Sequence, residues 1–187
     1  DSRRATIRTM ESAIGNLIAD AMRKATRADV ALTNGGGIRG EKLYEAGDVI
    51  TRRDILTELP FGNKTVVVEL TGAQIKEALE NGYSAIEDAS GRFAHVSGMR
   101  VKADLSKPAG MRVTSVEIGG NPIDLEKTYS LSTNDFLLRG GDGYTVFAEG
   151  KVIRSVLDGN LMASDVMVYV RIKGTEGATV DGRITFE

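Results

Sequence analysis

Three consecutive glycines, Gly35 to Gly37, follow a short apolar run and two polar residues in the stretch 32–39, LTNGGGIR. Glycine lets the backbone take positive φ and lets another molecule approach closely. Successive backbone N–H groups in such a turn can point at one anion, and Arg39 can add a bidentate contact to a phosphate or carboxylate. The alternative interpretation is a surface turn that needs glycine only for its geometry. A Walker A loop is excluded, because no Gly-Lys-Ser/Thr follows, and the spacing fits a Rossmann fingerprint poorly.

The chain is long enough to bury a core, with 187 residues of which 41% are hydrophobic, and we expect one domain covering 1–187. A net charge of −2 argues against a nucleic-acid binder, which needs a basic face. No apolar run approaches the length of a membrane span. The start, DSRR, is charged and abrupt, and we interpret it as a cut made in a longer protein.

The residues that carry thiolate and metal chemistry are scarce. Cysteine is absent, so disulfides and cysteine nucleophiles are excluded, and the single histidine is His95. Zinc and manganese hydrolase sites usually combine several imidazoles with carboxylates. We therefore predict no catalytic residue and no metal site in these 187 residues, and we expect His95 to be a half-exposed strand residue.

Apolar spacing and capping signals predict an α+β fold, with helices packed on mixed or antiparallel sheets. Helices are expected at 10–26, 51–58 and 71–81, and the last two begin with the capping-box pairs Thr51/Asp54 and Thr71/Gln74. Residues 161–172 fit either a helix or a strand. Strands are expected at 30–32, 64–70, 92–103 with a break at 97–98, 113–118, 129–133 and 180–186, with one more within 145–156.

Two further loops carry aromatic residues. In 59–63, LPFGN, Phe61 stands between a proline and a glycine, and the stretch 133–143 contains Phe136 and, between glycines, Asp142. Packing into the core is the usual role of such a ring, although rigid rings on loops also form stacking platforms for bases. Asp142 is either a turn residue or an acceptor for sugar hydroxyls.

Taken in order, the motifs TNGGGIR at 33–39, LPFGN at 59–63 and TNDF…GGDG at 133–143 resemble the C-terminal domain of the 5′-nucleotidase family. That family includes ecto-5′-nucleotidases, bacterial UDP-sugar hydrolases and 2′,3′-cyclic-nucleotide phosphodiesterases. The segment with Glu11 and GNLIADA at 15–21 also resembles the opening of that domain, so the likeness covers nearly the whole chain.

The resemblance implies a division of labour between two domains. Family enzymes carry two divalent metal ions, of the zinc or manganese type, and a catalytic His–Asp pair in an N-terminal metallophosphoesterase domain, which is absent here. Their C-terminal domain binds the nucleoside and part of the phosphate. We therefore expect the substrate-binding domain of an extracytoplasmic nucleotide phosphohydrolase, inactive on its own, with a nucleotide and the parent chain's N-terminal domain as its partners.

The resemblance also assigns roles to the aromatic and cationic residues. Phe61 and Phe136 resemble the two phenylalanines that sandwich the base. Arg39 resembles the arginine that reaches toward the phosphate, and Arg8 resembles a further arginine of the same site. Two phenylalanines would accept purines and pyrimidines alike, because every base has a π-face.

Small and polar residues complete the implied site. Asn34 resembles the asparagine that contacts the base, Gly36 belongs to the same glycine motif, and Asp142 resembles the acid that binds ribose hydroxyls. Gly98 lies where the family brings backbone to the base. Arg139 departs from the small or polar residue expected there, and such a change can alter substrate choice.

Two other functions stay open at this point. One is a stand-alone nucleotide- or nucleoside-binding module without catalysis, and the other is a structural domain whose loops no longer bind. An Asp-x-His signature and an Asn-His-Glu/Asp motif upstream of Asp1 in the native gene would favour the enzyme over the stand-alone module.

Overall fold

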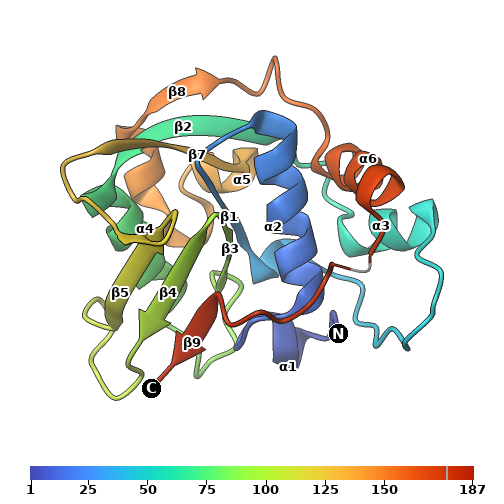
Figure 1. Cartoon of the computed structure of the whole chain (residues 1–187), viewed down its shortest axis with the longest axis horizontal. Helices are drawn as coiled ribbons and strands as arrows, with labels where there is room; N and C mark the ends of the chain where they lie inside the picture. The colour runs from blue at the N-terminus through green and yellow to red at the C-terminus, as the bar shows by residue number, and fades with distance from the viewer. Residues whose placement is uncertain (176) are drawn as a thin grey trace.

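The computed structural model describes residues 1–175 and 177–187, which form two sheets with helices around them (Figure 1). The larger sheet has the order β3-β1-β7-β2-β8. β1 runs parallel to β7, whereas β3, β2 and β8 are antiparallel to their neighbours. The bounds of these strands are β1 Val30–Asn34, β2 Thr65–Thr71, β3 Ala94–Ser97, β7 Thr128–Asn134 and β8 Lys151–Arg154.

The smaller sheet has the order β6-β5-β4-β9, and its last strand pairs in parallel with β4. Its strands are β4 Met99–Ala103, β5 Val113–Ile118, β6 Asn121–Pro122 and β9 Ile184–Phe186. The main hydrophobic core draws buried side chains from both sheets and from helix α4 (Gly72–Gly82). The two sheets therefore share one core.

A second core packs on the other side of the larger sheet. It joins buried side chains of helices α2 (Ala13–Thr26) and α6 (Met162–Lys173), with α3 (Arg52–Glu58) at its end. Burial of apolar surface on this scale is the main favourable contribution to folding. The remaining elements are short: α1 Arg4–Ile7, α5 Asp135–Leu138, and the 3₁₀ turns η1 Gly35–Gly37, η2 Gly141–Gly143 and η3 Thr145–Glu149.

The predicted α+β class and the three predicted helices are confirmed. Both capping boxes form: Thr51 accepts from the Asp54 backbone N–H, and Thr71 from that of Gln74. The first helix begins at Ala13 rather than residue 10, with Ser12 as its cap, and the ambiguous stretch at 161–172 is helical. The last strand is confined to Ile184–Phe186, and the four-residue helix α1 was missed because it is too short to show a period.

The topology brings four loops to one edge of the larger sheet. β1 and β7 are parallel neighbours, so their carboxyl ends lie at the same edge. β3 and β2 run antiparallel to them, pairing Ala94 with Asn34 and Thr65 with Asn134, so the loops that precede both strands reach that edge too. The glycine run, the Phe61 loop and the Phe136 loop converge for this reason.

The expectation that His95 is half-exposed is wrong. Its side chain is fully buried in β3, with Nε2 2.8 Å from the carbonyl oxygen of Ile7, and Phe93 packs edge-on against the ring. Gly15 of α2 leaves room for the imidazole, since a Cβ there would overlap it. Burial lowers the pKa of His95 to about 4, and nearby Arg183 adds to the effect.

Acidification is expected to destabilise the chain through His95. Its folded pKa, about 4, lies below the unfolded value of 6.5, so between these values the unfolded chain binds more protons. Stability therefore falls as pH drops through this window, by about 2 kcal/mol at pH 5 relative to pH 7. Urea unfolding at both pH values measures the difference. The His95→Gln chain should lose most of this dependence, and an unchanged acid response would assign it to carboxylates instead.

Candidate functional site

A cavity of about 400 Å³ opens at the sheet edge where the four loops meet. Seven of the eight predicted substrate-binding residues line it, and Gly37, Asn63, Gly91 and Arg139 complete the lining. The seven are Arg8, Asn34, Gly36, Arg39, Phe61, Phe136 and Asp142. Residues up to 134 positions apart in the sequence are thus gathered at one site, as Arg8 and Asp142 illustrate.

Gly98 does not lie on this cavity, and its predicted place there is corrected. It turns the chain from β3 into β4 at φ +77°, at the opposite end of β3. The backbone at the cavity belongs to Gly91 instead, whose carbonyl accepts from the Gly36 N–H at 2.8 Å. A Cβ on Gly36 would come within 2.8 Å of the Gly91 Cα, so this close approach requires glycine. No local signal marks Gly91, because its role depends on a contact with a distant loop.

The two predicted aromatic residues are exposed rather than in the core. Phe61 is 58% exposed and Phe136 is 39% exposed. The Phe136 ring lies against Gly141, where a Cβ would meet ring atoms at about 2.5 Å, so the glycine lets the ring take this position. The Arg39 guanidinium carbon lies 5.4 Å from the centre of the Phe61 ring, a cation–π arrangement. Both rings can therefore contact a ligand in the cavity.

A chain of amide and carboxylate groups holds Asp142 in place. The Asn34 Nδ2 donates to Asp142 Oδ2 at 2.6 Å, and the Asn134 Nδ2 donates to Asn34 Oδ1 at 3.2 Å. Asn134 in turn caps α5 by accepting from the Leu137 N–H at 2.9 Å. Asp142 itself sits at φ +54°, a conformation that non-glycine residues rarely adopt and that is enriched at functional sites. Its Oδ1 has no hydrogen-bond partner within the described chain, so it can accept from a ligand.

Three guanidinium groups and one carboxylate give the cavity a positive balance. Burial and the nearby charges of Arg4 and Arg39 lower the pKa of Arg8, and its Nε is buried without a hydrogen-bond partner. An anion beside Arg8 would relieve both costs. Arg139 is tied to Asp135 by a 2.9 Å ion pair, and Asp135 also accepts from the Lys64 N–H at 2.9 Å. The site is therefore suited to a ligand with an aromatic part and an anionic part.

Metal ligands are lacking in the part of the chain that the structure describes. Residues 1–175 and 177–187 contain no group of three or more His, Cys, Asp or Glu side chains placed to hold a metal ion. These residues therefore offer no ligand group for the two divalent ions, which the resemblance places in the preceding metallophosphoesterase domain. Among the same residues, no helix has the length and apolar character to cross a bilayer.

The comparison with known protein families decides the identity. The family described as "5′-nucleotidase, C-terminal domain" matches residues 1–149. This chain belongs to that family. The 5′-nucleotidase C-terminal fold continues past the matched part, because the crystal structure of a 5′-nucleotidase precursor from Thermus thermophilus covers 100% of the chain. That structure is 41% identical, with a TM-score of 0.90.

Two curated relatives match most of this chain. The "Trifunctional nucleotide phosphoesterase protein YfkN" of Bacillus subtilis is 44% identical over 158 residues, which is 80% of this chain and 11% of YfkN. The "Snake venom 5′-nucleotidase" of Gloydius brevicauda is 31% identical over 195 residues, 94% of this chain and 33% of the venom protein. The chain also spans only 37% of the Thermus protein, so it corresponds to a fraction of each relative's length.

Proposed function

We propose that residues 1–187 form the substrate-binding domain of a nucleotide phosphohydrolase and bind a nucleoside monophosphate in the 400 Å³ cavity. The observation that carries the proposal is the gathering of two exposed phenylalanines and two arginines, Arg8 and Arg39, on one cavity. Aromatic rings recognise the base by stacking, and guanidinium groups recognise phosphate by charge-assisted hydrogen bonds.

Each part of the nucleotide has a matching group in this arrangement. The base stacks on Phe61 and Phe136, the ribose hydroxyls donate to Asp142, and the phosphate is drawn to Arg8 and Arg39. Asn34 holds the Asp142 carboxylate through its 2.6 Å hydrogen bond, and so sets the position of the ribose. The contribution of this domain to hydrolysis is to hold the substrate in a reactive orientation.

The catalytic step belongs, in this proposal, to a metallophosphoesterase domain that precedes Asp1 in the parent chain. The two divalent metal ions, of the zinc or manganese type, are assigned to that domain, because the described residues of this chain offer no ligand cluster. An extracytoplasmic location is supported by the relative named as a venom 5′-nucleotidase.

The proposal is tested by calorimetric titration of the 187-residue chain with AMP, adenosine and ribose 5-phosphate. AMP should bind in the high micromolar to millimolar range, roughly 4 to 6 kcal/mol, because an open half-site offsets little of the cost of association. Adenosine and ribose 5-phosphate should each bind more weakly than AMP, since each lacks one anchoring part. Equal binding of all three would contradict the proposed site.

Replacing Arg39 by glutamine is expected to weaken AMP binding about tenfold and to leave adenosine binding unchanged. The physical reason is that only AMP presents the phosphate that a guanidinium recognises. Arg53→Gln on α3 is the matched control, because Arg53 is exposed and its side chain makes no ion pair with another described residue. A parallel loss of adenosine affinity would mean that Arg39 acts by supporting Phe61 rather than by binding phosphate.

A further inference from the structure

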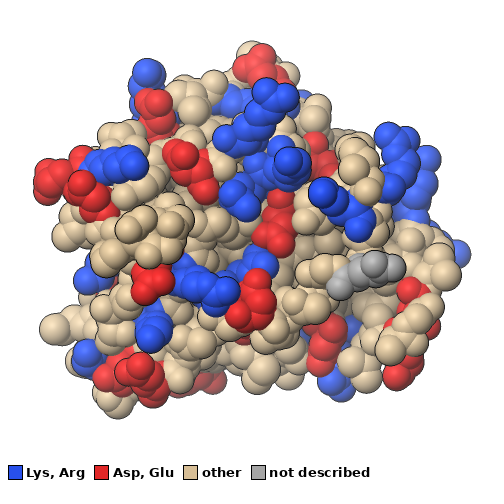
Figure 2. Space-filling model, in the orientation of Figure 1, with Lys and Arg blue, Asp and Glu red and all other residues tan. Residues whose placement is uncertain are grey.

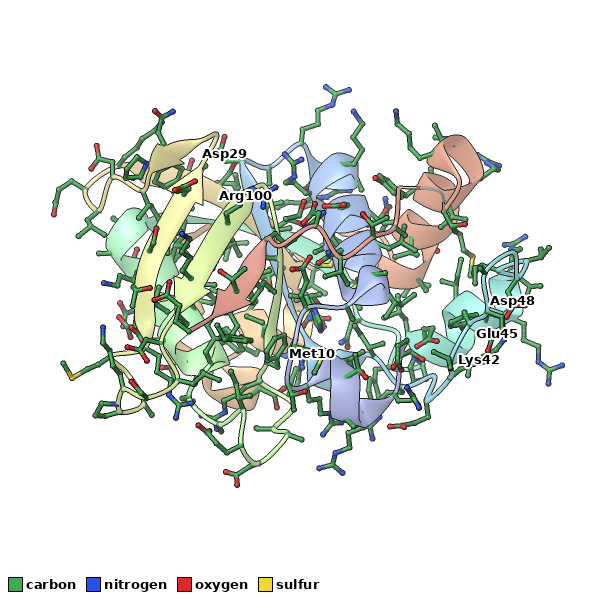
Figure 3. All side chains as sticks on the ribbon, turned by 60° about the horizontal axis from the view of Figure 1, so that its bottom comes forward. Met10, Asp29, Lys42, Glu45, Asp48 and Arg100 are labelled. Carbon is green, nitrogen blue, oxygen red and sulfur yellow. The ribbon has the colours of Figure 1, made fainter. Side chains whose placement is uncertain are left out.

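A second hollow, of about 710 Å³, lies at the opposite end of β1 from the nucleotide cavity. It is formed by the C-terminal ends of α2 and α6, the β3–β4 turn and the residues that lead into β9. The two hollows share no lining residue. Figure 3 labels Arg100, which lines the second hollow, and Asp29, which directly precedes β1.

Positive charge is concentrated in this hollow although the whole chain has a net charge of −2. Six cationic residues line it against three acidic ones. Figure 2 shows Lys and Arg side chains gathered over α2 around a smaller acidic group. The six cations are Arg23, Lys24, Arg27, Arg100, Lys173 and Arg183.

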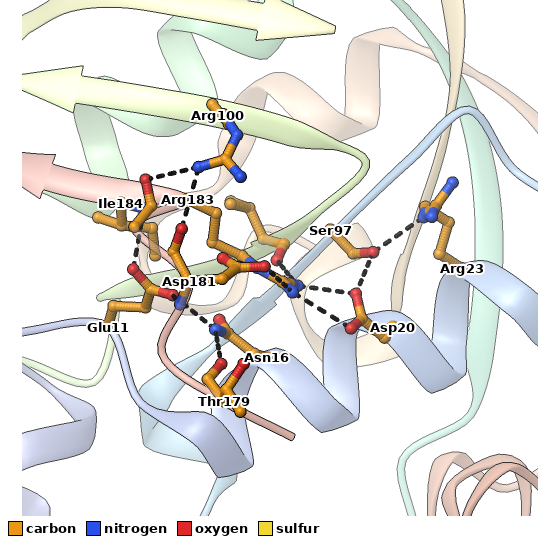
Figure 4. A network of polar contacts seen from close by, with 12 residues as sticks. Glu11, Asn16, Asp20, Arg23, Ser97, Arg100, Thr179, Asp181, Arg183 and Ile184 are labelled. Carbon is orange, nitrogen blue, oxygen red and sulfur yellow. Dashed lines mark hydrogen bonds and ion pairs between the residues drawn. The ribbon is translucent and has the colours of Figure 1, made fainter. Parts of the chain in front are cut away.

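Two of the three acids already form ion pairs within the protein, both with the same arginine. Arg183 pairs with Asp20 at 2.7 Å and with Asp181 at 2.9 Å, as the network in Figure 4 shows. Lys24 and Arg27, by contrast, make no hydrogen bond or ion pair through their side chains with any residue the structure describes, and both are exposed. The hollow therefore has a surplus of cationic groups that are free to bind a ligand.

Specific hydrogen bonds hold the Arg23 side chain in place. Its Nε donates to the hydroxyl of the buried Ser97 at 2.8 Å, and that hydroxyl donates to Asp20 (Figure 4). Gly98 provides the space, because a Cβ there would lie 2.9 Å from the Arg23 Cδ. The terminal nitrogens of this guanidinium thus remain available in a fixed orientation.

The preference for cations at helix C-terminal ends explains only some of the cations in this hollow. Arg23 and Lys24 lie in the last turn of α2, and Lys173 ends α6, where cations favour the helix dipole. That effect does not require the two helix ends to meet on one hollow, nor does it explain Arg27 beyond the helix or Arg100 on β4. The volume also falls within the usual range of small-molecule sites.

We propose that this hollow binds a small, multiply charged oxyanion of the oligophosphate class, at a site separate from the nucleotide cavity. Several cations on one concave surface favour a ligand with three or more negative charges over a monophosphate, because each charge adds to the attraction. The proposal does not depend on the function proposed for the first cavity.

The test is a titration of the 187-residue chain with tripolyphosphate, followed by calorimetry and by amide shifts in an NMR spectrum. One molecule should bind, with shifts at residues 97–100 and 119–120 rather than at Gly36 and Gly91. The Lys24→Gln/Arg27→Gln chain should bind at least about tenfold more weakly, and added salt should weaken binding by screening. Both side chains are exposed and without partners among the described residues, so folding should be unaffected.

Two controls decide between a site and diffuse attraction. Arg53→Gln/Lys102→Gln removes the same charge from exposed positions outside the hollow and should leave affinity unchanged. Arg39→Gln should also leave it unchanged. The proposal would be overturned if the first control weakened binding equally, if Arg39→Gln abolished binding, or if no binding occurred at millimolar tripolyphosphate.

ATP identifies the natural source of the phosphate chain. It is titrated into the Phe61→Ala/Phe136→Ala chain and compared with tripolyphosphate. Tighter binding of ATP indicates that the ligand is a nucleotide, and equal binding indicates an inorganic phosphate chain.

Discussion

Replacing Phe136 or Phe61 by alanine is expected to weaken AMP binding about 5- to 150-fold, since a base–aromatic stack contributes roughly 1–3 kcal/mol. The double variant should show no binding at millimolar AMP. Calorimetric titration of the single and double variants measures the loss. Adenosine binding should fall by the same factor, because the stack involves the base and not the phosphate.

The exposure of both rings makes these variants informative. Phe61 and Phe136 are 58% and 39% exposed, so alanine at either position leaves no cavity in a hydrophobic core. Leu157→Ala is the matched control, since Leu157 is 93% exposed and lies outside the cavity. Phe136→Leu separates stacking from simple apolar contact: it keeps apolar area but loses the flat ring. If the Phe61→Ala/Phe136→Ala chain bound AMP with wild-type affinity, the proposed binding of the base in this cavity would be wrong.

Replacing Glu11 by alanine is expected to destabilise the fold by about 3–5 kcal/mol, because buried donors that lose their acceptor cost about 1–3 kcal/mol each. The Glu11 carboxylate is only 7% exposed and accepts from Asn16 Nδ2 at 2.6 Å and from the Asp181 N–H at 2.9 Å. It also accepts from the Ile184 N–H at 3.2 Å (Figure 4). One side chain before α2 thus holds the start of β9 against the rest of the molecule.

Urea unfolding measures the change in the free energy of unfolding, and hydrogen exchange shows which part of the chain is destabilised. Exchange at residues 181–186 should speed up more than exchange in β1, because the lost bonds are local to β9. Glu11→Gln keeps one acceptor oxygen and should lose less stability than alanine. Glu77→Ala on α4, an exposed position, is the control. The same stability for Glu11→Ala and Glu77→Ala would show that β9 does not depend on this carboxylate.

The local elements could be predicted because their signals are local. The capping boxes at Thr51 and Thr71 and the alternation at 113–118 depend on neighbours within a few residues. His95 was predicted wrongly because its burial depends on α1 and α2 closing over β3, through Ile7 and Gly15. Glu11 was noticed only as part of a motif, because its partners lie 170 and 173 residues away along the chain.

The same division holds for the candidate site. The sequence by itself determined the kinds of groups on offer: glycine turns, two phenylalanines on constrained loops, arginines, and too few metal ligands. Only the tertiary structure decided which of them meet, through the pairing of parallel β1 and β7 with antiparallel β2 and β3. That pairing brought Gly91 to the cavity and left Gly98 at the opposite end of β3, beside Arg23. The physical reason is that strand direction fixes which loops share an edge of the sheet, and strand direction is set by long-range burial rather than by adjacent residues.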